Sequence, residues 1–150
     1  MKNIRVILSL ATLAVFIFAG AVTLFAAHPA YLHALSDLRM ARAHLLERPG
    51  HGALRAEERD AVEEINRAIE EVRTAAAEDD KNPNAQPPVD LPRDWSGRLR
   101  RAMELLNQAY RDVDGFEDNP RARGMRSRAL GHISRARQHV RAAMDIAGTR

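Results

Sequence analysis

The stretch WSGRLRRAMELLNQAYRDVDGF, residues 95–116, carries the clearest structural pattern in this sequence of 150 residues. Apolar residues recur along it at alternating spacings of four and three: Trp95, Leu99, Ala102, Leu106, Ala109, Val113 and Phe116. Such a heptad seam is typical of a helix whose axis lies nearly along those of its neighbours. The stretch therefore predicts a helical bundle.

Apolar residues at helical spacing predict three further helices. One begins near Pro29 and ends at the breaker segment 49–52, and a second covers about residues 54–80. The last begins at Pro120, after Asp118 and Asn119, which suit a helix N-cap. Three prolines within residues 83–88 exclude a helix there, so residues 81–92 should form a loop. No segment has a strand pattern, so the fold class is all-α.

The sequence also repeats itself at an offset of 68 residues. Seven residues of the second predicted helix recur in the fourth, and Ala34, Leu38 and Ala41 recur as Ala102, Leu106 and Ala109. Residues 28–150 are therefore interpreted as one four-helix bundle built from two similar hairpins, about 29–80 and 91–148. An up-down-up-down topology joins such hairpins most simply, and it places the second and fourth helices on a diagonal.

The first 27 residues have the layout of a secretory signal. Met1–Arg5 is positively charged, Val6–Ala27 is a run of 22 uncharged residues, and Ala26 and Ala27 close it. The run is also long enough to cross a bilayer as a helix, so a retained membrane anchor is the alternative. Both interpretations place residues 28–150 outside the cytoplasm, in the periplasm or secreted. Membrane contact is expected only if this helix is retained.

Cleavage of the signal is testable on protein purified from the producing cell. Intact-mass analysis should show the loss of about 26 or 27 residues. A full-length species that only detergent extracts would favour the anchor. Full-length protein free in the cytoplasm would contradict export.

Composition excludes several classes of function. The chain has no cysteine, which excludes disulfides, thiol catalysis and zinc–thiolate or iron–sulfur sites. It also lacks a glycine-rich phosphate loop and a Gly-x-Ser-x-Gly motif. We therefore expect no enzyme, and assign neither catalytic nor cofactor-binding residues. The net charge of +3 includes Lys2 and Arg5, and the basic segment has no interleaved aromatics, so nucleic acid is not an expected partner.

Charge is distributed unevenly along the body. Residues 54–81 hold ten acids and five bases, whereas residues 119–150 hold eight arginines and one acid. Either the two helices compensate each other inside the bundle, or the arginine face meets an anionic surface or an envelope protein. The leading expectation is a non-catalytic protein that acts by binding or structural contact in the cell envelope. A homo-oligomer is compatible with this role.

Histidines offer the remaining chemistry. His33 and Asp37, followed by Met40 and His44, share one face of the first helix, opposite Leu35 and Leu38, and this face is expected to be exposed or to meet a partner. A surface ion pair is the simpler interpretation, and a weak Cu or Zn site or a subunit contact is the alternative.

A second stripe consists of Met125, His132 and His139, each seven residues from the next. The offset of 68 places Glu57, Glu64 and Glu71 at the matching positions of the second helix. Glu–His pairs could form if the bundle brought these two helices close together, but the predicted topology places them on a diagonal. Boundary histidines are the simpler interpretation, and a metal or haem site is the alternative.

The segment His132-Ile133 to His139-Val140, with Ala136 between, resembles the repeat of the small periplasmic metal-binding proteins. The resemblance implies an exported four-helix bundle that binds divalent metals such as copper. It makes divalent-metal (Cu or Zn) binding the alternative function, with His33, Asp37, His44, His132 and His139 as candidate ligands.

Overall fold

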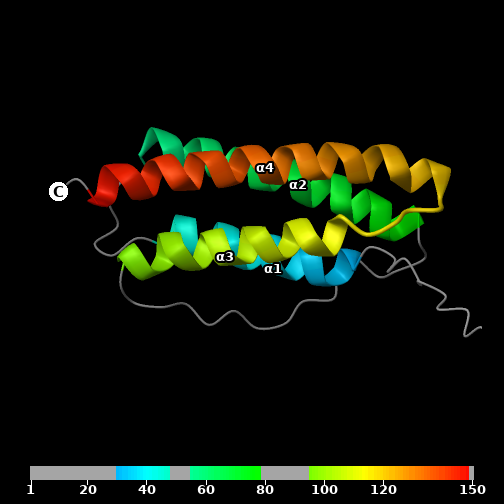
Figure 1. Cartoon of the computed structure of the whole chain (residues 1–150), viewed down its shortest axis with the longest axis horizontal. Helices are drawn as coiled ribbons and strands as arrows, with labels where there is room; N and C mark the ends of the chain where they lie inside the picture. The colour runs from blue at the N-terminus through cyan, green and yellow to red at the C-terminus, as the bar shows by residue number, and fades with distance from the viewer. Residues whose placement is uncertain (1–29, 48–54, 79–94, 149–150) are drawn as a thin grey trace, which may run out of the picture.

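The computed structural model describes residues 30–47, 55–78 and 95–148, except for the side chains of residues 95 and 96 (Figure 1). Regular structure in these residues consists of four helices: α1 (Tyr31–Leu46), α2 (Ala56–Glu78), α3 (Trp95–Val113) and α4 (Pro120–Gly148). The all-α prediction is thus confirmed for this part of the chain. The predicted signal or anchor (1–27) and the predicted loop (81–92) lie outside the described residues. Within the described residues, no helix is long and apolar enough to cross a membrane.

The helices form two layers, with α2 beside α4 and α1 beside α3 (Figure 1). Contacts between α1 and α2 and between α3 and α4 join the layers. Each neighbouring pair is antiparallel. At one end, for example, the backbone N–H of Ala30 donates to the carbonyl of Asp112 at 2.7 Å, so the start of α1 meets the end of α3. It follows that α2 and α3 run in the same direction and lie diagonally opposite each other in the bundle.

The predicted up-down-up-down topology is therefore wrong. Heptad seams favour antiparallel neighbours, but they do not choose which helices become neighbours. The 16 residues between Glu78 and Trp95 span up to about 50 Å when extended, and α2 is about 34 Å long. This connection can therefore join opposite ends of the bundle. The acidic α2 then lies against the arginine-rich α4.

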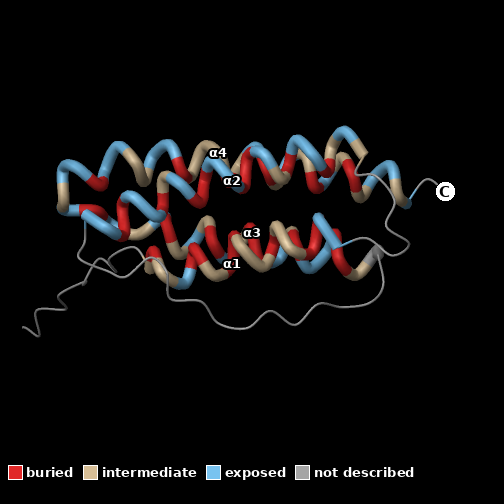
Figure 2. The backbone as a smooth tube through the Cα atoms, turned by 180° about the vertical axis from the view of Figure 1, so that it is seen from behind, coloured by how far each residue is buried: buried red, intermediate tan, exposed pale blue. Residues whose placement is uncertain are grey.

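The core lies between the layers, where the buried residues of all four helices face inward (Figure 2). Alanines occupy many buried positions of each helix, which lets the backbones approach closely. Leu38 and Leu106, matched by the 68-residue offset, are both fully buried. The seam of α3 ends earlier than predicted: the helix stops at Val113, and Phe116 is 58% exposed.

Local capping explains where two helices begin. The side-chain Oδ1 of Asn119 accepts a hydrogen bond from the backbone N–H of Arg121 at 3.0 Å, which confirms the predicted cap before Pro120. At the start of α2, Glu58 Oε2 accepts from the backbone N–H of Arg55 at 2.8 Å, as the acidic half of a capping box does.

Candidate metal centre

Three glutamates of α2, at heptad spacing, face the neighbouring helix α4. Glu57, Glu64 and Glu71 are seven residues apart, so they lie on one side of the helix. Opposite them, His139 Nδ1 lies 2.9 Å from Glu57 Oε2, and His132 Nδ1 lies 2.7 Å from Glu64 Oε2. The predicted diagonal placement of these two helices is wrong, and the Glu–His pairs form because α2 and α4 are neighbours.

The middle group, which we call the Glu64 layer, consists of Glu64, Arg67, His132 and Arg135. Glu64 is only 7% exposed. Besides His132, it accepts from Arg135 Nε at 2.9 Å and from Arg67 at 2.8 Å. Burial raises the pKa of Glu64, but hydrogen bonds from His132 and Arg135 outweigh it, so this pKa lies below its usual range. Arginine neutralises the carboxylate here and occupies the space around it.

The next group, the Glu57 layer, has a different composition. Its members are Glu57, Asp60, His139 and Ala142. Asp60 and Ala142 stand three residues after Glu57 and His139, the positions that Arg67 and Arg135 hold in the Glu64 layer. No arginine pairs with a carboxylate of this layer among the described residues.

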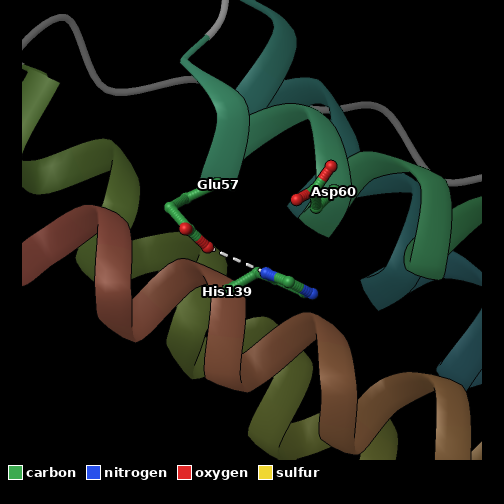
Figure 3. Close-up of side chains that lie close together, drawn as sticks. All are labelled: Glu57, Asp60 and His139. Atoms are coloured by element: carbon green, nitrogen blue, oxygen red, sulfur yellow. Dashed lines mark hydrogen bonds and ion pairs between the residues drawn. The ribbon is translucent and has the colours of Figure 1, made fainter.

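Glu57, Asp60 and His139 converge (Figure 3). One donor atom from each, two carboxylate oxygens and an imidazole nitrogen, lie within 4.8 Å of one another. Glu57 and His139 are about one-third exposed, with Asp60 on the open side. Within the described ranges, this is the one group of three histidine or acidic side chains close enough to share a metal ion. Of the predicted ligands, it includes only His139.

The third glutamate of α2, Glu71, forms an ion pair with α4. Two of the guanidinium nitrogens of Arg128, Nε and Nη2, donate to Glu71 at 2.7 and 2.8 Å. This fork raises the pKa of Arg128 above its ordinary value. Met125, the third member of the predicted stripe, packs against the core. Charge compensation between the acidic and the arginine-rich helix is thereby confirmed.

The predicted exposed face of α1 is largely buried, so that expectation is wrong. Asp37 is 7% exposed and His44 is 2% exposed, whereas His33 is exposed. The reason is again topological, because α3 packs along α1 and covers this face. His33, Asp37 and His44 are not among the residues that converge as metal ligands.

Burial changes the titration of both covered groups. Burial, together with the nearby charge of Asp112, raises the pKa of Asp37 to about 6. Burial, with Arg101 and Arg98 close by, lowers the pKa of His44. His44 Nδ1 has no hydrogen-bond partner among the described residues. The lowered pKa favours a neutral imidazole at His44.

Sequence reasoning missed Glu57 and Asp60 as ligands. Their signal is the Glu-x-x-Asp spacing, which puts two carboxylates on adjacent turns of one helix face. That spacing becomes informative only once α2 and α4 are known to be neighbours. Then the position of His139 opposite Glu57 follows from the antiparallel register.

Comparison of the chain with protein-family models, with curated proteins and with solved structures gave no match. The fold therefore defines the class only as a small all-helical protein, and among its described residues Glu57, Asp60 and His139 form a group that could hold a metal ion. Its function has to be inferred from that group.

Proposed function

We propose that this protein binds one divalent cation of the Zn²⁺ or Cu²⁺ class at the Glu57 layer, without catalysing a reaction. The observation that supports this proposal is the convergence of Glu57, Asp60 and His139, whose donor atoms lie within 4.8 Å of one another. Zinc ligands lie about 2.0–2.2 Å from the ion, so donors sharing it are at most about 4.4 Å apart. Small side-chain movements therefore suffice to close the site.

Charge favours a cation at this layer over the Glu64 layer. Two carboxylates stand beside one imidazole in this layer, and no arginine pairs with either carboxylate among the described residues. Binding a divalent ion removes their mutual repulsion. In the Glu64 layer the guanidiniums of Arg67 and Arg135 already contact the carboxylate, and they repel a cation.

The donor set also fits this class of ion. Imidazole nitrogen suits Zn²⁺ and Cu²⁺, whereas sites for Mg²⁺ and Ca²⁺ use oxygen alone. Three protein ligands leave one tetrahedral position for water. Glu57 lies at the second helical position of α2, and the N-terminal capping bond of Glu58 anchors the same turn. The ligands thus stand on two packed helices.

Titration calorimetry with Zn²⁺ and Cu²⁺, on chelator-stripped protein, tests this assignment. We expect one site with a dissociation constant on the order of 1 µM. His139→Gln and Asp60→Asn should each weaken binding at least about tenfold, because the first removes the imidazole nitrogen and the second removes the charge of a carboxylate ligand. His132→Gln is the matched control: it removes a histidine paired with glutamate in the Glu64 layer, and it should change affinity less than about threefold.

Two results would contradict the metal site. The first is absence of saturable heat with about 1 mM metal. The second is an equal loss of affinity in His132→Gln and His139→Gln, which would place the ion elsewhere. Contact with an envelope partner through the charged helix faces, and export itself, stay predictions from the sequence.

A further inference from the structure

A cavity of about 290 Å³ lies between α3 and α4. Among the described residues it is lined by Met103 of α3 and by Ser134, Arg137, Gln138 and Arg141 of α4. The four α4 residues share one helix face, because they are spaced by three, one and three. At roughly 30 Å³ per water molecule, the volume equals that of about ten waters, enough for a small organic ion.

The arginines of this cavity differ from most others of α4. Four α4 arginines form ion pairs with carboxylates: Arg121 with Glu78, Arg126 with Asp114, Arg128 with Glu71 and Arg135 with Glu64. Arg137 and Arg141 have no carboxylate partner within the described part of the chain, and no acid lines their cavity there. The cavity therefore carries uncompensated positive charge.

Arg137 is held in place without a counter-charge. Its guanidinium lies over the ring of Tyr110, 5.4 Å from the centroid. Its Nε is buried and has no hydrogen-bond partner among the described residues. The aromatic ring orients the guanidinium by a cation–π contact, but it does not neutralise it. An anion bound to the terminal nitrogens of Arg137 would neutralise this guanidinium.

We propose that this cavity binds a phosphate monoester with a small apolar body. Two guanidiniums, the Ser134 hydroxyl and the Gln138 amide can all donate hydrogen bonds, and phosphate oxygens accept them from several directions. Met103 supplies an apolar wall for the rest of the ligand. None of the residues that line this cavity belongs to the proposed metal site.

Titration of ¹⁵N-labelled protein with phenyl phosphate, at constant ionic strength, tests the proposal by NMR. We expect saturable shifts in the amides of residues 134–141 and in arginine Nε–H signals. The double variant Arg137→Gln/Arg141→Gln should bind at least about tenfold more weakly. Arg59→Gln/Arg123→Gln removes the same charge from exposed positions outside this cavity, and it should bind within about twofold of the parent.

Two further measurements cover unfolding of the double variant and the choice between a phosphate monoester and inorganic phosphate. If loss of the Tyr110 contact unfolds the double variant, Arg141→Gln alone should still weaken binding more than about threefold, since Arg141 is exposed. Inorganic phosphate should bind at least about fivefold more weakly than phenyl phosphate, because it lacks an apolar body. Equal binding of the two would overturn the monoester assignment.

Three other outcomes would overturn the site itself. One is no saturation up to about 10 mM phenyl phosphate. Another is equal weakening in both double variants, which indicates diffuse charge attraction only. The last is binding to anionic phospholipid vesicles that depends on Arg137 and Arg141 while phenyl phosphate does not bind, which would assign these arginines to a lipid surface.

Discussion

Leu106→Ala should lower the free energy of unfolding by about 2–5 kcal/mol, and Leu38→Ala should do the same. Both side chains are fully buried in the core between the two layers of helices. Truncation removes apolar contacts and leaves a cavity that the alanine-rich surroundings, with their short side chains, fill poorly. Urea unfolding at neutral pH measures the change.

Leu46→Ala is the matched control for these core variants. Leu46 ends α1 and is 49% exposed, so its truncation should cost less than about 1 kcal/mol. A loss below about 0.5 kcal/mol at both Leu38 and Leu106 would mean that these residues do not form the core.

Asp37→Asn should raise the free energy of unfolding at pH 7.5 by up to about 3 kcal/mol. The carboxyl group is buried against α3, and its pKa rises from 3.8 to about 6 in the folded protein. The folded state therefore holds this proton more tightly than the unfolded state does. Ionised Asp37 destabilises the fold near neutral pH, and a neutral amide of similar shape removes that penalty.

The sign of the pH dependence follows from the raised pKa. Between pH 3.8 and about 6 the folded state binds more protons at Asp37, so its contribution to stability falls as pH rises through this window. The gain from Asp37→Asn should consequently shrink to well under about 1 kcal/mol at pH 4. Thermal or urea unfolding at the two pH values checks this difference.

A charge control separates the burial effect from general electrostatics. Asp145→Asn removes one exposed carboxylate from α4, and it should change stability by less than about 0.5 kcal/mol at both pH values. A gain at Asp37→Asn that is equal at pH 4 and pH 7.5 would show that ionisation of Asp37 is not its cause. His33, Asp112 and Arg101 surround Asp37 electrostatically and should be left unchanged.

One of the three residues of the candidate metal site, His139, could be predicted from the sequence. His139 was identified because its spacing from His132 and its neighbouring residues form a recognisable helical pattern. Glu57 enters the sequence pattern as one of three glutamates that match the histidine stripe at the offset of 68, and neither Glu57 nor Asp60 is among the predicted ligands. The error at Asp37 and His44 had the same origin as the missed carboxylates, since both depended on which helix covers which face.

The sequence by itself determined the helices and one of their caps. These features depend on residues within a few positions of one another, so they can be predicted without knowing the partner helix: the helical spacing, the Pro49–Gly52 breaker and the cap at Asn119. Only the tertiary structure decided that α2 lies beside α4, bringing Glu57 within 2.9 Å of His139 although 82 residues separate them. Heptad seams of similar composition allow several neighbour arrangements, and the choice among them depends on packing and charge summed over whole helices.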